Sequence, residues 1–379
     1  MKFAESKGQR IPGGLSKILY INWPLVLLLT AVACIGFLVL YSVAGGSLDP
    51  WARPQIIRFV IGLVVMFFVG FTPLIIWRGL TPVVYLGSFA LLVYVELFGR
   101  IGMGAQRWID LGFIQIQPSE MMKIALVMML ALYYDWLPES KTSRPLWVIA
   151  PLAMIIAPSV LVLTQPDLGT SIMLLAGGGA VMFLAGVSLW YFGAAILSIV
   201  GAVALVLKSR GTGWQILQDY QFRRIDTFLD PATDPLGSGY HITQSKIALG
   251  SGGWTGRGFL EGTQARLNFL PEKQTDFVFT TLAEEFGFVG GVGLLTLYVL
   301  IIVFCTASAI GNKNRFGALL TGGIASTFFL FFAFNMAMVM GLAPVVGVPL
   351  PLVSYGGSAM LVLLGAFGLI QSAHVHRPR

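Results

Sequence analysis

Long apolar runs separated by short polar segments dominate the hydrophobic pattern of this chain. A helix needs about 20 apolar residues to cross the hydrocarbon of a bilayer. The runs predict about ten transmembrane helices, at 19–43, 55–74, 80–98, 119–136, 146–164, 168–187, 189–208, 279–308, 317–341 and 356–373. Very short links flank 168–187, so the pattern fixes the number of spans only to within about one. The sequence therefore predicts an all-α polytopic membrane protein, with residues 1–379 forming one integral membrane domain.

Composition and charge narrow the class of protein. Hydrophobic residues make up 56% of the chain and charged residues only 11%, whereas a soluble domain carries about 25% charged residues. The net charge of +7 is compatible with nucleic acid, anionic lipid or an inside-positive bias. Nucleic acid is the least favoured partner because the basic residues are spread over loops and termini. Cys34 and Cys305 lie in apolar runs, where they act as small hydrophobes, so no disulfide framework is expected.

Lys and Arg in short flanking segments predict the orientation. The side of the two termini carries more of them than the opposite side, which has Arg53, Arg58, Arg100 and Arg107. The residues on the terminal side are Lys2, Lys7, Arg10, Lys17, Arg78, Lys141, Arg144, Lys313, Arg315, Arg377 and Arg379. Both termini are therefore expected in the cytoplasm, and the first apolar run is interpreted as a retained span.

With that orientation, the long polar segment at 209–278 forms a large extracytoplasmic loop between spans 7 and 8. Loops of this length are usually functional or disordered. Apolar residues in Tyr240–Leu249 recur at near-helical spacing, and five glycines between residues 250 and 258 are typical of a tight irregular turn. Its basic residues are nearly matched in number by acids. The loop is thus predicted to be an ordered, mixed-charge segment.

Asp276 is the first of four polar features close to the apolar runs. An ionisable side chain at membrane depth costs several kcal/mol unless it is paired or hydrated, and so is a functional candidate. Asp276 immediately precedes the run at 279–308, which places it at the outer membrane boundary. Asp is also a favoured helix N-cap residue. The local pattern by itself favours the capping role.

Two further clusters admit a structural and a functional interpretation. Arg107 is followed by Ser119, a plausible N-cap, and by Glu120 and Lys123, which are three residues apart and can pair on one helix face. A stabilising ion pair and a substrate-binding role are equally well supported there. Asp167 follows Pro166 in a tight turn between two spans, where capping of the next helix is the favoured interpretation.

The fourth feature is a segment rich in Pro and Gly, from Pro344 to Ser358, before the last span. Lipid cannot satisfy the backbone of such a broken segment, so it lines a cavity or is buried in protein. The three histidines are scattered and form no metal motif with cysteine. From the residues alone, a transporter and a membrane-embedded enzyme both remain open.

The same clusters resemble the shape, elongation, division and sporulation (SEDS) family. The resemblance extends from Gly104-Ala105-Gln106-Arg107-Trp108 to the motif Pro-Leu-Val-Ser-Tyr-Gly-Gly-Ser at 351–358. The loop motifs resemble the RodA branch more than the FtsW branch; they are Phe228–Pro231, Asp234–His241, Gln244–Lys246 and Gly250–Gly253. One departure is Lys273-Gln274, where relatives often carry a His just before the Thr.

The resemblance implies a peptidoglycan glycosyltransferase that polymerises lipid II at the outer face of a bacterial inner membrane during cell elongation. It implies that Asp276 is the catalytic base. Arg107, Lys123 and Lys246 are then candidates for substrate binding, with Glu120 and Asp167 orienting them or contributing to a metal site. A divalent cation, Mg²⁺ or Mn²⁺, is an expected cofactor, and no nucleotide is expected.

The expected partners are a class B penicillin-binding protein that supplies the transpeptidase, other membrane proteins of the elongation complex and membrane lipids, but no nucleic acid. Two alternatives belong to other functional classes. A lipid II flippase would be favoured by charged residues at the middle of several spans and by an internal repeat. A non-catalytic scaffold for wall synthesis would not need Asp276.

Overall fold

The computed structural model describes residues 14–102, 105–110, 112, 115–215, 222, 226, 230, 238–267, 269 and 272–377. In lipid a backbone must satisfy its own polar groups, so the apolar runs form helices. Within this part of the chain they are α1 (Trp23–Val43), α2 (Ala52–Phe71), α3 (Leu74–Phe98), α4 (Pro118–Trp136), α5 (Pro145–Thr164), α6 (Leu168–Leu184), α7 (Leu189–Ser209), α11 (Val278–Ile310), α12 (Arg315–Val339) and α13 (Gly357–Val375). Each predicted span coincides with one of these helices, which confirms the all-α architecture.

The helix ends show where local patterns misled the prediction. α3 begins at Leu74 rather than at residue 80. Arg78 interrupts the apolar run there, but its guanidinium lies 2.6 Å from the carboxylate of Asp135 in α4, so the helix continues through it.

Eight of the described helices are long and apolar enough to cross a membrane, and α6, with 17 residues, is a shorter apolar helix. α4 is not among the eight and carries three charged residues, Glu120, Lys123 and Asp135.

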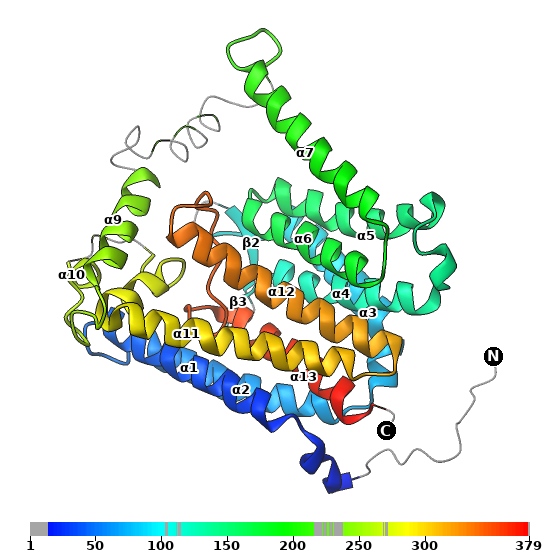
Figure 1. Cartoon of the computed structure of the whole chain (residues 1–379), viewed down its shortest axis with the longest axis horizontal. Coiled ribbons are helices and arrows are strands. Elements are labelled where there is room, and N and C mark those ends of the chain that lie inside the picture. The colour runs from blue at the N-terminus through cyan, green and yellow to red at the C-terminus, as the bar shows by residue number, and fades with distance from the viewer. Residues whose placement is uncertain are drawn as a thin grey trace.

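Among the eight candidate spans, α13 and α12 have the largest buried shares. α13 packs along α2, and α12 packs against α4, α6 and α11. Figure 1 shows α7 projecting away from the other helices, and only Ser209 of that helix is buried. An apolar helix that buries so little against protein is suited to contact with lipid.

Short elements lie between the long helices. β1 (Arg100–Gly102), β2 (Ala105–Asp110) and β3 (Gln115–Ile116) form an antiparallel sheet in that order, with Ile109 of β2 opposite Ile116 of β3. The helix periodicity gave no sign of these strands. The predicted helix in the long loop is confirmed as α9 (Ser238–Ser251). The other short elements are η1 (Gly14–Tyr20), η2 (Glu139–Lys141) and α10 (Thr263–Arg266).

Some sequence expectations lie outside the described residues. They concern the basic residues Lys2, Lys7, Arg10 and Arg379 and most of the loop motif at 228–237. Figure 1 shows η1 and the end of α13 at the end of the bundle opposite α9 and α10. The described beginning and end of the chain therefore lie on one side of the bundle, as the charge pattern predicts.

The glycine-rich turn after α9 packs against a break in α11. Gly287 has φ 65° and ψ −161°, which interrupts the helix. The N–H of Gly258 donates to the carbonyl of Glu285 at 3.1 Å, and loop carbonyls accept from the first two N–H groups after the break. A Cβ on Gly256 would lie only 2.0 Å from the oxygen of Glu285. The predicted irregular turn is thus an ordered strap that satisfies the broken backbone of α11.

Candidate active site

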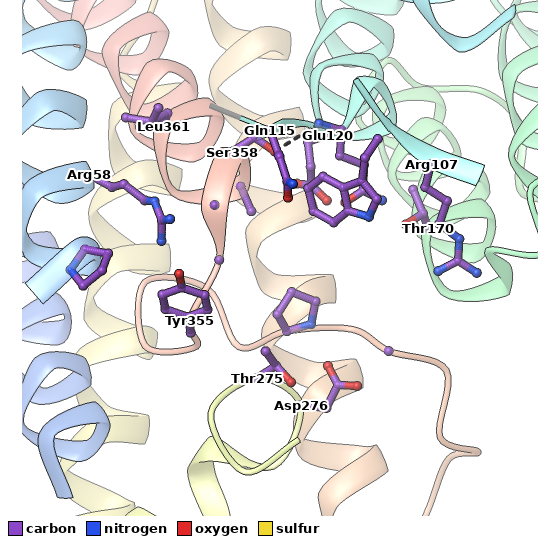
Figure 2. Close-up of a pocket in the computed structure, with 18 of the residues that line it drawn as sticks. Arg58, Arg107, Gln115, Glu120, Thr170, Thr275, Asp276, Tyr355, Ser358 and Leu361 are labelled. Carbon is purple, nitrogen blue, oxygen red and sulfur yellow. Dashed lines mark hydrogen bonds between the residues drawn. The ribbon is translucent and has the colours of Figure 1, made fainter. Parts of the chain in front are cut away.

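A cavity of about 1290 Å³ opens among α2, the small sheet, α4, α6 and the segment between α12 and α13. Figure 2 shows its polar side chains, which come from elements far apart in the sequence. The carboxylates that line it are Asp49, Asp110, Glu120, Asp167, Glu272 and Asp276, and the guanidiniums are Arg53, Arg58 and Arg107. Many of the sequence-predicted polar residues therefore meet in one place.

Asp276 lies in the turn just before α11, and its backbone is held by two other elements. The Nδ2 of Asn335, from α12, donates to the carbonyl of Asp276 at 2.9 Å and to that of Val348 at 2.7 Å. The hydroxyl of Ser354 donates to the carbonyl of Thr275. Gly347 lies beside the Asp276 carboxylate, where a Cβ would be 3.7 Å from Oδ2. The turn is thus fixed from both sides while the carboxylate faces the cavity.

The carboxylate of Asp276 does not cap α11. The N-cap residue is Phe277, and no side chain caps the helix there. Burial raises the pKa of Asp276 to about 6, and the negative charges of Glu272 and Asp167 act in the same direction. A carboxylate with a pKa near 6 is ionised at neutral pH yet basic enough to accept a proton. The capping role that the local pattern favoured for Asp276 is therefore wrong.

Asp167, in contrast, is the N-cap of α6. Its carboxylate accepts from the N–H of Thr170 at 3.1 Å and from the Thr170 hydroxyl at 3.0 Å, which confirms the capping prediction. It also lines the cavity and lies 3.8 Å from a guanidinium nitrogen of Arg107. Arg107 extends from β2 and donates to the carbonyls of Gln165 and Pro166. Asp167 therefore caps α6 and also lines the cavity beside Arg107.

Glu120 and Lys123 form the predicted pair on one face of α4, with 2.7 Å between Lys123 Nζ and Glu120 Oε1. The ammonium also lies 4.0 Å from the ring centre of Phe331 in α12. Glu120 lines the cavity, whereas Lys123 lies behind it and is 5% exposed. Ser119 is not the N-cap, because α4 begins at Pro118 and the cap position is Gln117. Proline is favoured at the first helical position, and it moved the start by one residue.

The broken segment between α12 and α13 lines the cavity, as its Pro and Gly content predicted. Gln55 of α2 holds it: the Gln55 side chain donates to the carbonyl of Ser354 at 2.9 Å and accepts from the N–H of Gly356 at 3.3 Å. The N–H of Tyr355 donates to the carbonyl of Gln274 at 2.8 Å. The segment thereby joins α2 to the turn that carries Asp276.

Lys246 is placed away from the other predicted site residues. It is exposed on α9, its Nζ lies against Gly341 at the end of α12, and it is not among the described residues that line the cavity. Across the described residues, no three His, Cys, Asp or Glu side chains lie close enough together to hold one metal ion.

Comparison with known proteins places this site in a family. The profile of the FtsW, RodA and SpoVE cell cycle proteins matches residues 22–379. The chain belongs to this family. Together with its apolar helices, that membership makes it a multi-pass membrane protein.

Named relatives and solved structures cover nearly all of the chain. It is 42% identical to the peptidoglycan glycosyltransferase MrdB of Escherichia coli strain K12, over 93% of each protein. It is 32% identical to the peptidoglycan glycosyltransferase RodA of Treponema pallidum, over 94% of this chain and 98% of that protein. A chain in a peptidoglycan synthase complex that coordinates polymerisation and crosslinking superposes with a TM-score of 0.79 at 32% identity, covering 93% and 97% of the two chains. The crystal structure of Thermus thermophilus RodA superposes with a TM-score of 0.70 at 29% identity, over 95% and 98%.

In this FtsW/RodA/SpoVE member, sequence reasoning missed the residues that hold Asp276 in place. Asn335 and Gln55 are polar residues inside apolar runs and are at most 1% exposed. Buried polar groups of this kind are almost always hydrogen-bonded. Their positions within predicted spans were the available signal, but nothing local indicated which carbonyls they bind.

Proposed function

We propose that this chain is a peptidoglycan glycosyltransferase that polymerises lipid II into glycan strands at the outer face of the bacterial inner membrane during cell elongation. The main support is Asp276, a carboxylate with a raised pKa that faces a polar cavity at the predicted outer boundary. The relatives of this chain, MrdB and RodA, are named peptidoglycan glycosyltransferases. The acids and bases gather around one cavity, and the sequence shows no convincing internal repeat, which favours an enzyme over a flippase.

The reaction needs one base and no strong acid. A sugar hydroxyl of the acceptor attacks the anomeric carbon of the donor, and Asp276 takes the hydroxyl proton. The new carbon–oxygen bond forms as the bond from the anomeric carbon to the lipid diphosphate breaks, and the diphosphate leaves with the bonding electrons. It is already a weak base, so a second carboxylic acid to protonate it is unnecessary, unlike in glycoside hydrolysis. A single displacement of this kind inverts the anomeric carbon.

The remaining predicted site residues support this chemistry in different ways. Arg107 lines the cavity and offers positive charge near the leaving diphosphate, while Asp167 and Glu120 hold Arg107 and Lys123 in place. Lys246 stays a prediction, and from its place on α9 it can reach only substrate that extends beyond the cavity. A divalent cation also stays a proposal, because Mg²⁺ is commonly held by one or two carboxylates together with substrate phosphates. We propose no nucleotide cofactor.

We further propose a class B penicillin-binding protein as the partner that cross-links the strands, together with other elongation-complex proteins and membrane lipids. The support is the structural similarity to a chain of a peptidoglycan synthase complex. Both termini are proposed to lie in the cytoplasm, on the side opposite Asp276.

The decisive experiment is a polymerisation assay with Asp276→Asn. The purified chain with its penicillin-binding partner, supplied with fluorescent lipid II and Mg²⁺, is expected to make long glycan in the presence of moenomycin. Asp276→Asn keeps the side-chain shape but cannot accept the proton, so the rate should fall by roughly 10²-fold to 10⁴-fold. Gel electrophoresis of the glycan measures the product.

Asp226→Asn is the matched control, because it removes a carboxylate outside the described cavity lining. The control should polymerise like the wild type, and both variants should show the wild-type melting temperature. Equal rates for Asp276→Asn and the wild type would contradict the proposal. An inactive wild type that moves lipid II across liposome membranes would replace the polymerase with the flippase.

A further inference from the structure

The three guanidiniums that line the described cavity differ in what they already bind. Arg107 is engaged by two backbone carbonyls and Asp167. Arg53 lies at the exposed start of α2, 3.7 Å from the carboxylate of Asp49. Arg58 forms no ion pair with any described residue, and its Nη1 is buried without a hydrogen-bond partner among them. Arg58 is therefore the cation in the cavity wall whose counter-ion the described protein does not supply.

The depth of Arg58 makes this unpaired charge costly. It lies six residues after Ala52, the first residue of α2, which corresponds to about 9 Å along the helix axis. A guanidinium at such a depth is expensive unless it is paired or lines a polar cavity. Its carbon Cζ lies 4.9 Å from the ring centre of Tyr355. That contact orients the guanidinium and leaves its charge without an anion.

The surroundings of Arg58 hold it in a fixed position. Trp51, Gln55 and Arg58 follow one another at helical spacing on one face of α2. Trp51 packs edge-on against Tyr355 with 5.0 Å between ring centres, and the Gln55 side chain bonds the backbone on both sides of Tyr355. Tyr355, which these contacts hold in place, therefore fixes the position of the Arg58 guanidinium at the cavity wall. A guanidinium held in this way suits a charge-assisted hydrogen bond to a phosphate.

We propose that Arg58 binds the diphosphate of a lipid-linked substrate, in a second phosphate subsite on the α2 side of the cavity. The inference rests on the proposed function. Polymerisation requires two lipid-linked diphosphates at once, one on the growing strand and one on the incoming lipid II. Figure 2 shows Arg58 with Tyr355 on one side of the pocket and Arg107 with Thr170 on the other. Arg107 serves the first diphosphate and Arg58 serves the second.

The test measures binding without turnover. The chain carrying Asp276→Asn is placed in phosphatidylcholine nanodiscs, and native mass spectrometry counts the undecaprenyl diphosphate molecules bound per chain. About two are expected at saturation. Adding Arg58→Gln should leave about one, because losing a charge-assisted hydrogen bond weakens that subsite by roughly 10-fold to 100-fold. Arg58→Lys keeps the charge and should restore part of the binding.

Arg266→Gln is the matched control, because it removes the same charge from α10, outside the described cavity lining, and it should keep both molecules bound. Undecaprenol, which has no phosphate, should not bind at the Arg58 subsite. Neither inorganic diphosphate nor phosphatidylglycerol should displace the bound lipid, since a free anion lacks the lipid tail and a phosphodiester lacks the second phosphate.

The proposal is overturned if Arg58→Gln binds as many undecaprenyl diphosphate molecules, with the same affinity, as the Asp276→Asn parent. It is also overturned if phosphatidylglycerol competes equally well, because the subsite would then be a general lipid contact. A melting temperature equal to that of the parent excludes misfolding of Arg58→Gln. Since the assay needs no catalysis, failure of polymerisation and failure of this subsite are distinguishable.

Discussion

Two aspartates at the ends of helices show how the same residue type takes different roles. The carboxylate of Asp167 is occupied by the N–H and hydroxyl of Thr170 and lies near Arg107. The carboxylate of Asp276 caps nothing, and burial together with the nearby acids Glu272 and Asp167 raises its pKa. A general base must be ionised before it acts, and it accepts a proton better when its pKa lies close to the operating pH. By raising the pKa of Asp276, burial and these acids make the carboxylate a stronger base at neutral pH.

A pH profile checks this electrostatic account. Polymerisation should increase as Asp276 loses its proton, so kcat/KM is expected to rise with pH through an apparent pKa of about 6. Glu272→Gln removes a negative charge that opposes ionisation of Asp276. The pKa of Asp276 should fall, and the rising limb should move to lower pH.

Glu261→Gln removes an acid from the outer loop, outside the described cavity lining, and should leave the limb in place. A limb that moves to higher pH in Glu272→Gln, or that moves equally in both variants, would contradict the electrostatic effect of Glu272 on Asp276.

At the scale of elements, the cavity depends on interrupted helices. The segment between α12 and α13 and the turn before α11 are both irregular, and each satisfies part of the backbone of the other. The hydroxyl of Ser354 accepts from the N–H of Leu350 at 2.8 Å and donates to the carbonyl of Thr275. Irregular backbone at membrane depth is tolerated where protein pairs its polar groups. The same bonds hold Asp276 in position.

Ser354→Ala separates positioning from stability. Ser372 is a matched control: it is also a buried serine, and its hydroxyl donates to the carbonyl of Thr72 at 2.7 Å, far from Asp276. Ser372→Ala loses one hydrogen bond and should lower the free energy of unfolding by about 1–3 kcal/mol, whereas Ser354→Ala loses two and should lower it by at least as much. Only Ser354→Ala is expected to lower kcat, by roughly 10-fold, because it releases the Asp276 turn. Melting curves and polymerisation rates of both variants, measured together, decide whether the role is positional or purely structural.

The strap after α9 gives a second test at this scale. Gly256 has φ 85°, and a Cβ there would lie 2.0 Å from the carbonyl oxygen of Glu285. Gly256→Ala is therefore expected to reduce stability by more than about 1 kcal/mol. A Cβ on Gly250, in α9, would meet no other atom within 4 Å, so Gly250→Ala should melt at or slightly above the wild-type temperature. Equal melting temperatures for the two variants would show that the strap does not pack against α11 in this way.

Over the whole molecule, charge and apolar surface set how the bundle sits in the membrane. The described ends of the chain lie on one side, opposite α9 and α10. Asp276 lies at the end of the long loop, in the turn before α11, and almost all of α7 is exposed. In the proposed orientation, substrate reaches Asp276 from the outer leaflet.

Reporter fusions test that orientation. A green fluorescent protein fused after Arg379 should fluoresce, because it folds in the cytoplasm, whereas alkaline phosphatase at the same position should be inactive. Alkaline phosphatase inserted at Trp214, in the long loop, should be active because the loop lies outside. The reverse pattern would place Asp276 at the cytoplasmic face and remove its access to outward-facing lipid II.

The sequence by itself determined the features that depend on neighbouring residues. Apolar runs located the ten long helices of the described chain, because in lipid the polar backbone of such a run must pair its own N–H and C=O groups, as a helix does. The Glu120–Lys123 pair followed from a spacing of three residues, and the Asp167 cap followed from its place after Pro166 in a tight turn between two spans. The glycine cluster indicated the turn after α9. Resemblance of motifs, not spacing, singled out Asp276 as the base.

Only the tertiary structure decided which of these features meet. Ser354 and Thr275 are far apart in the sequence, so no local pattern could reveal that they hold one turn together. The three short strands form because they pair with one another, and the packing of α9 on α12 places Lys246 beside Gly341, outside the described cavity lining. The unpaired charge of Arg58 likewise appears only once every neighbouring element is in place. Helices and helix caps depend on residues close together in the sequence, so the sequence by itself could locate them. The cavity is formed by residues that are far apart in the sequence and meet only when the helices pack, so only the tertiary structure could define the site.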